Sequence, residues 1–262
     1  LIWLLLAAAL ALAWVSQRNP LLRAAWQRVG RSRTGMASAT VLLFFVCVAL
    51  LDSLHYRPRL QGGEAQIGAD GERKPVVYAV QVLSLLDSIL SPLRLRNEKT
   101  YSEPLATRAH AKEAIELRDA SGRVRQIRDY PRLQYGGAHL GADETRRDAD
   151  IAERLLRGLA IALPFWWVLA AATAALLARA EACSHVEAWR RIWCNETDFA
   201  CNAVLAVLAA LLLVGVSLDQ LAVDYHVFGT DKVGQDVLYQ VLKSVRTALV
   251  IGLVTTLVML PL

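Results

Sequence analysis

Apolar runs of membrane-spanning length dominate the pattern of this chain. Three of them, at residues 36–54, 158–178 and 200–218, come close to the roughly 20 residues that a helix needs to cross about 30 Å of hydrocarbon. Shorter apolar runs occupy residues 1–15 and 247–262. We predict an all-α polytopic membrane protein with five transmembrane helices, of which the first and the last are truncated. We therefore expect the sequence to be a fragment.

A cleaved signal peptide is the alternative interpretation of residues 1–15. Such peptides carry basic residues before a short apolar core and small residues after it. Here the basic residues Arg18, Arg23 and Arg28 follow the apolar run. This order favours the end of a membrane helix.

A polar region at residues 55–157, about the size of a small domain, separates the second predicted helix from the third. Its apolar stretch at 76–90 predicts a short helix that ends at Ser91 and Pro92. We expect this region to be an extracytoplasmic α+β domain inserted between helices 2 and 3.

The second half of this region predicts a β-hairpin. Residues 113–127 form two short strand patterns around Gly122, which tolerates the positive φ of a tight turn. Residues 135–150 are rich in glycine, aspartate and arginine and are expected to form a loop or linker. The predicted division is 1–54 (two helices and a basic loop), 55–157 (outer domain), 158–199 (third helix and its loop) and 200–262 (the remaining, incomplete part).

Basic residues in the short loops predict the orientation, because cytoplasmic loops carry an excess of lysine and arginine. Two loops show this excess, through Arg18, Arg23, Arg28, Arg31 and Arg33 in one and Arg179, Arg190 and Arg191 in the other. We expect both loops in the cytoplasm and residues 55–157 and 219–246 on the opposite side. The absence of cysteine from 55–157 is consistent with an oxidising compartment.

The loop at 179–198 also carries an apolar stripe spaced as one face of a helix. The stripe consists of Ala182, Val186, Trp189 and Trp193. A helix lying in the lipid headgroup layer accounts for it. An ordinary helical connector with tryptophans at the membrane interface accounts for it equally well.

Composition excludes several classes of protein. The chain is 55% hydrophobic and 20% charged, which is too apolar for an average soluble protein. The net charge of +5 is not gathered into a basic patch interleaved with aromatic residues, so we expect no nucleic-acid partner. Four cysteines are too few for a disulfide-dense scaffold.

Residues 226–246 hold the most informative pattern. Gly229 permits a sharp turn, and Thr230 or Asp231 can cap a new helix. Valines repeat every four residues from Val233, which predicts an amphipathic helix along the membrane or against neighbouring spans. Arg246 is expected at the interface where the last span begins.

This pattern resembles the start of the transmembrane domain in C-type permease subunits of dipeptide, oligopeptide and nickel ABC importers. The matching positions are Gly229, Thr230, Asp231, Gly234, Asp236 and Arg246. The resemblance covers residues 218–262, and its spacing is more specific than a lone glycine pattern. One departure is Gln235, where the family more often has arginine.

The resemblance implies a type I permease subunit in the bacterial inner membrane that transports peptides or similar small solutes. It implies four kinds of partner: a homologous second permease subunit, two cytoplasmic ATPase subunits, a periplasmic solute-binding protein and the lipid bilayer. The family's ATPase-coupling loop is expected beyond Leu262. The helices and polar domain before residue 200 form an unusual N-terminal extension relative to this family.

No catalytic, cofactor-binding or metal-binding residues are predicted. The sequence has no glycine-rich phosphate loop, so ATP hydrolysis is expected in the partner subunits and the chain is not expected to be an enzyme. The spacings of Cys183, His185, Cys194 and Cys201 match no zinc pattern. Residues interpreted as surface or boundary groups are His110, His139, Asp129, Asp143, Asp148, Asp52, Asp219 and Asp224.

A membrane sensor with a periplasmic ligand-binding domain is the alternative function. Residues 36–178 alone, two helices around an outer domain, would suit it. Against it, two more apolar runs follow, and the loop at 179–198 has the length of a connector and not of an output domain.

Overall fold

The computed structural model describes residues 19–59, 79–118, 124–141 and 143–259, together with residues 3, 4, 7, 8, 11, 14, 15 and 18. Within these residues, four helices are long and apolar enough to cross a membrane. They are α3 (Arg33–Ser53), α6 (Arg147–Ala180), α8 (Cys201–Ala222) and α9 (Val237–Met259). The chain is thus a helical protein with the features of a multi-pass membrane protein. The predicted helix at 1–15 falls largely outside the described residues.

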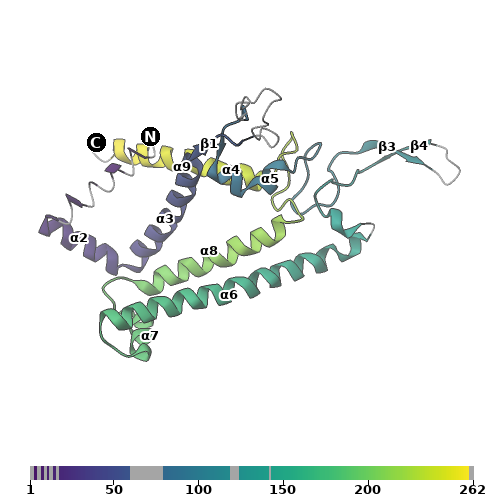
Figure 1. Ribbon diagram of the computed structural model, residues 1–262. Helices are drawn as coiled ribbons and strands as arrows, with labels where there is room; N and C mark the ends of the chain where they lie inside the picture. Colours follow the sequence, from purple (N-terminus) through teal and green to yellow (C-terminus); the bar gives the residue numbers. More distant parts are fainter. Residues whose placement is uncertain are drawn as a thin grey trace, which may run out of the picture.

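Helices α6 and α8 lie side by side, and α3 contacts both α8 and α9 (Figure 1). Small residues form the α6 side of the α6–α8 contact at four-residue spacing, namely Gly158, Ala162, Ala170, Ala174 and Ala178. A Cβ on Gly158 would lie only 2.9 Å from the Cα of Ser217 on α8. Small side chains let membrane helices approach this closely, which maximises van der Waals contact.

Trp166 interrupts this row of small residues. Its indole N–H donates a hydrogen bond of 2.9 Å to the carbonyl of Leu205 on α8, and the ring packs beside Ala170 and Ile192. Pro164 lies inside α6, and the helix continues on both sides of it.

Helix α6 begins at Arg147 and not near residue 158 as predicted. The extra turns are polar but form intrahelical ion pairs, Asp150 with Arg154 at 2.8 Å and Glu153 with Arg157 at 2.8 Å. Pairs with this four-residue spacing stabilise a helix outside the bilayer. Before α6, the predicted loop at 135–150 contains two single turns, η1 (Ala138–Leu140) and η2 (Glu144–Arg146).

The region between α3 and α6 is built from short elements. Strand β1 (His55–Tyr56) pairs with β2 (Leu83–Ser84), and two short helices follow, α4 (Leu85–Ile89) and α5 (Ser91–Leu95). The predicted helix within 76–90 is therefore only the five residues of α4. Helix α4 ends at Ile89, just before Ser91 and Pro92 as predicted, and these two residues begin α5, because proline fits the first turn of a helix.

The predicted hairpin is confirmed. Strands β3 (Glu113–Arg118) and β4 (Val124–Asp129) are antiparallel, with Glu113 opposite Asp129 and Arg118 opposite Val124. The turn with Gly122 lies outside the described residues.

The two basic loops meet at one end of the helices. They contain α2 (Pro20–Arg31) and α7 (His185–Cys194), and the amide of Ala200 donates to the carbonyl of Gly30 at 2.8 Å. Arg31 also pairs with Asp198 at 3.2 Å. We call this the inner end and the opposite end the outer end. There the described residues between 55 and 146, here called the outer region, meet residues 223–236. The predicted grouping of loops agrees with this arrangement.

The second loop contains the predicted helix, α7, which carries three of the four residues of the predicted apolar stripe. Ala188 and Ile192 form the buried face of α7, whereas Val186 is 81% exposed and Trp193 is 56% exposed. Ala182 precedes the helix and has a positive φ of 51°. Trp189, also in the predicted stripe, is half-buried and packs against the cluster that contains Ile192.

Candidate functional site

The segment between α8 and α9, residues 223–236, is here called the motif loop. It contains five of the six positions that match the permease pattern, here called the signature residues. Gly229 and Gly234 both have positive φ, 73° and 82°. A Cβ at Gly229 would lie 2.2 Å from the carbonyl oxygen of Ser102, and one at Gly234 would lie 1.9 Å from that of Glu98. Only glycine fits these two positions.

The motif loop is joined to residues 98–102 by hydrogen bonds. The amide of Glu98 donates to the carbonyl of Gly234 at 2.8 Å, and the amide of Thr230 donates to that of Ser102 at 3.2 Å. The buried hydroxyl of Thr230 donates toward the carbonyl of Thr100 at 2.9 Å and lies 3.0 Å from the Ser102 hydroxyl. The signature threonine thus attaches the loop to the outer region.

The two signature aspartates have different local roles. Asp231 does not cap a helix as predicted: its Oδ1 accepts from the amides of Val233 and Gln235, both at 2.9 Å, and so closes a turn. Asp236 caps α9 instead, because its Oδ1 accepts from the amides of Leu238 at 2.8 Å and Tyr239 at 3.3 Å. The positive φ of Gly234 is incompatible with an α-helix and delays the helix start to residue 237.

Helix α9 also runs without interruption through residue 247. The predicted amphipathic helix and the predicted last span are therefore one element. Arg246 lies within α9 and not at its beginning.

A buried histidine connects the motif loop to the outer region. His226 is 2% exposed, with its Nδ1 2.7 Å from Oδ2 of Asp236 and its Nε2 3.4 Å from Oε1 of Glu98. Glu98 in turn accepts from the amides of Gln134 at 2.8 Å and Tyr135 at 2.7 Å. One carboxylate from each side of the junction therefore faces the imidazole.

These contacts decide the charge of His226. Burial alone would lower its pKa, but the contacts with Asp236 and Glu98 outweigh burial and raise the pKa to about 9. Burial alone would raise the pKa of Glu98, but His226 and the backbone amides lower it below its usual value. At neutral pH the site holds an imidazolium between two carboxylates.

A second group of charges ties α9 to its neighbours. Asp52, at the end of α3 and 1% exposed, lies 2.6 Å from Nζ of Lys243 and 3.2 Å from Nε of Arg246. Lys243 also contacts both oxygens of Asp87 on α4 at 2.7 Å, and the hydroxyl of Tyr239 donates to Asp87 at 2.8 Å. Asp52, interpreted from sequence as a simple boundary residue, is the partner of signature residue Arg246.

A third polar group attaches the motif loop to α6. Asp150 accepts from Arg154 and from the Tyr225 hydroxyl, both at 2.8 Å, and lies 3.0 Å from His139. Arg154 also pairs with Asp224 at 2.7 Å. His139 and Asp224, interpreted as surface and boundary residues, thus belong to an ion-pair group.

His110, also interpreted from the sequence as a surface residue, lies apart from this group. It is exposed and lies 3.1 Å from Glu103. In the part of the chain that the structure describes, no group of three or more histidine, cysteine or acidic side chains is placed to hold a metal ion.

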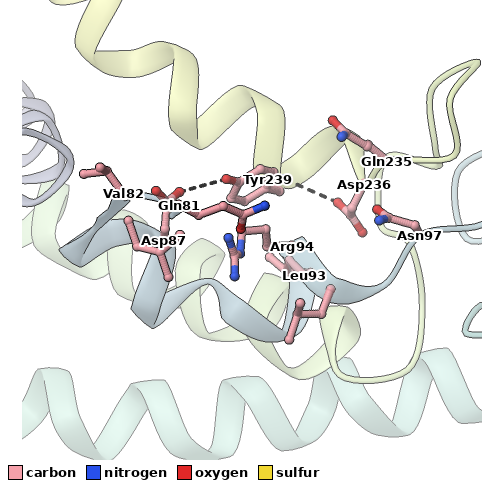
Figure 2. Close-up of a pocket in the computed structure, with 11 residues that line it drawn as sticks. Gln81, Val82, Asp87, Leu93, Arg94, Asn97, Gln235, Asp236 and Tyr239 are labelled. Carbon is pink, nitrogen blue, oxygen red and sulfur yellow. Dashed lines mark hydrogen bonds between the residues drawn. The ribbon is translucent and has the colours of Figure 1, made fainter. Parts of the chain in front are cut away.

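A cleft of about 520 Å³ opens beside Asp87 and Asp236 (Figure 2). We call it the outer cleft. One wall comes from residues 81–97, and the other from Gln235, Asp236 and Tyr239. Gln235, the departure from the family pattern, faces this cleft.

Sequence reasoning identified the signature positions but missed Glu98, His226 and Lys243. His226 stands directly before the pattern, but a lone histidine gives no signal of two carboxylate partners. Glu98 is separated from His226 by more than a hundred residues of sequence, and only the folded outer region brings them together.

Comparison with protein-family models, with curated proteins and with solved structures found no match. The permease resemblance therefore rests on the residues of the motif loop and α9.

Proposed function

We propose that the chain is part of a permease subunit of an ATP-binding-cassette importer that moves peptides or similar small solutes across the bacterial inner membrane. The observation that carries this proposal is the pattern Gly229, Thr230, Asp231, Gly234, Asp236 and Arg246 at the start of a candidate membrane-spanning helix. Each of these residues has a distinct structural role: the two glycines allow close backbone contacts, and the polar residues close the turn, cap α9 or pair with residues of other elements.

The contacts of α9 suit a subunit that changes conformation. Lys243 and Arg246 link α9 to Asp52 on α3, and Lys243 and Tyr239 link it to Asp87 on α4. A displacement of α9 is therefore transmitted to the outer region through charged contacts. In an importer, two cytoplasmic ATPase subunits would drive that displacement by binding one permease state better than the other.

The outer region would then lie on the periplasmic side, where a solute-binding protein delivers the solute. A homologous second permease subunit would complete the translocation path. In this proposal ATP hydrolysis belongs to the ATPase partners.

Uptake by cells tests this proposal. The complete gene is deleted from cells that carry it, and the uptake of radiolabelled di- and tripeptides is measured with and without depletion of cellular ATP. We expect ATP-dependent uptake of at least one peptide class to fall to background and to return with the intact gene. Unchanged uptake of every peptide in the deleted strain would contradict peptide transport and favour the sensor alternative.

A matched pair of variants sharpens the uptake experiment. Arg246→Gln removes the signature cation next to Asp52, whereas Arg128→Gln removes an exposed cation on β4. We expect the first variant to lose most of the restored uptake and the second to retain it. Equal uptake by the two variants would contradict a role for the signature in transport.

A further inference from the structure

The outer cleft contains carboxylates that have no capacity left for a ligand. The oxygens of Asp87 accept from the Ser84 amide, from Tyr239 and from Lys243. Those of Asp236 are used by His226 and by the first amides of α9. Both carboxylates are therefore neutralised from behind the cleft wall, and neither attracts a further cation.

Arg94 in the same cleft is in the opposite situation. It projects from α5 and is half-buried, and its guanidinium has no hydrogen bond or ion pair among the residues that the structure describes. Its Nε is fully buried and lacks an acceptor. A buried donor without an acceptor is costly, and a guanidinium binds a carboxylate through two parallel hydrogen bonds. The terminal nitrogens of Arg94, which are not among the buried unpartnered atoms, can donate both bonds to an anionic ligand in the cleft.

The surroundings of Arg94 restrict the ligand further. Figure 2 shows Arg94 and Gln81 between Asp87 on one side and Asp236 with Asn97 on the other. The amides of Gln81, Asn97 and Gln235 can each donate and accept. Apolar side chains complete the wall, namely Val82, Leu83, Leu93 and Leu95.

The charge of the cleft selects a monoanion. Arg94 supplies one positive charge without a partner among the described residues, and one such charge balances a monoanion but leaves a doubly charged phosphate half compensated. A carboxylate carries one negative charge and matches the planar guanidinium. An apolar group attached to it would contact the leucine side chains.

We propose that the outer cleft is a binding site for a small organic carboxylate, with Arg94 holding the carboxylate and Leu83, Leu93 and Leu95 contacting its apolar part. This inference goes beyond the transport proposal and does not depend on it. It concerns binding alone, and a permease or a sensor could use it.

Ligand-observed NMR tests the site with two matched probes. The purified chain in lipid nanodiscs is titrated with N-acetyl-L-leucine and with N-acetyl-L-leucinamide, which differ only in the carboxylate. We expect saturation transfer to the acid and at least a tenfold weaker affinity for the amide. Equal affinity for the two probes, or no transfer to the acid, would overturn the proposal.

Three variants locate the binding. We expect Arg94→Gln to lower the affinity for N-acetyl-L-leucine at least tenfold and to leave the affinity for the amide unchanged. Arg128→Gln on β4 should leave both affinities unchanged. Arg94→Lys keeps the positive charge but lacks the planar guanidinium, and it should lower the affinity for N-acetyl-L-leucine less than Arg94→Gln does. Thermal unfolding verifies that each variant is folded. Acid binding that survives in both Arg94 variants would overturn the assignment even if wild-type protein binds the acid.

Discussion

At the scale of single residues, the motif loop leaves little choice of side chain. The space beside Gly234 is occupied by the backbone of Glu98, whose side chain is itself fixed by His226 and by the amides of Gln134 and Tyr135. The backbone of Glu98 therefore cannot move aside without breaking buried polar contacts. Steric fit and charge pairing reinforce one another at this junction.

Gly234→Ala should be among the most destabilising single changes in the chain. The new Cβ would meet the Glu98 carbonyl at 1.9 Å, and the positive φ disfavours any side chain. We expect the free energy of unfolding to fall by more than about 2 kcal/mol, measured by thermal or denaturant unfolding in detergent.

Gly215→Ala provides the matched control. A Cβ on this helical glycine of α8 would meet nothing within 4 Å, so alanine should be neutral or slightly stabilising there. Equal stability of the two variants would contradict the close approach at Gly234.

His226 should make stability depend on pH. Its pKa is raised in the folded protein, so the folded state holds the proton more tightly than the unfolded state does. The resulting stabilisation is complete below the unfolded pKa of about 6.5 and is lost as pH rises through about 9. A shift of this size corresponds to about 3 kcal/mol.

Unfolding measured between pH 6 and pH 10 tests this expectation. His226→Gln should be less stable than wild type at pH 6, and the difference should shrink toward pH 10. His110→Gln, at an exposed histidine, should keep the wild-type pH profile. A His226→Gln profile parallel to that of wild type would show that His226 is not the responsible group.

At the scale of elements, the α6–α8 pair depends on small residues. Gly158, Ala162, Ala170, Ala174 and Ala178 recur at multiples of four residues, and all of them are buried. The spacing is visible in the sequence, but alanine is common in helices, and the pattern alone does not say which neighbour it faces. The contact with Ser217 on α8 supplies that information.

Ala170→Leu should weaken this pair, because Ala170 is fully buried and three extra carbon atoms have no space. We expect a loss of about 1–3 kcal/mol in stability, measured by unfolding in detergent. Ala171→Leu adds the same atoms at the adjacent exposed position of α6 and should have little effect. A similar loss in both variants would argue against a specific α6–α8 contact.

At the scale of the whole molecule, the sequence predicted the elements better than their junctions. Apolar runs located α3, α6, α8 and the last part of α9, because the hydrocarbon thickness imposes a length that composition reveals. The polar turns at the start of α6 and the uninterrupted passage of α9 through Arg246 were missed. The start of α6 is stabilised by local ion pairs and by Arg154 with Asp224, and α9 by ion pairs with Asp52 and Asp87. Hydropathy carries no information about such pairs.

The site was predictable to a similar extent. The glycines and aspartates of the motif loop were identified, but the partners Glu98, Asp52 and Asp87 come from segments far away in the sequence. A lone acidic residue in a polar region gives no sign that it will be buried against a histidine. Tertiary contact, and not local pattern, determines these roles.

The orientation can be tested by labelling. In a background with all four cysteines replaced by serine, Lys112→Cys at the outer end and Val186→Cys at the inner end are treated with an impermeant thiol reagent. We expect Lys112→Cys to react in intact spheroplasts and Val186→Cys to react only after permeabilisation. The reverse result would invert the proposed orientation.

Helix α6 has a mechanical consequence for the surface that the molecule presents. Its first part, residues 147–157, rises about 16 Å above the predicted span at 1.5 Å per residue. On this projecting part, Asp150 accepts a hydrogen bond from Tyr225 of the motif loop, and Arg154 forms an ion pair with Asp224. The start of α6 therefore supports the motif loop from one side, while residues 98–102 hold it from another. Because the loop is attached near the end of a long helix, a small change in the tilt of α6 would displace the motif loop by more than it displaces the middle of the helix.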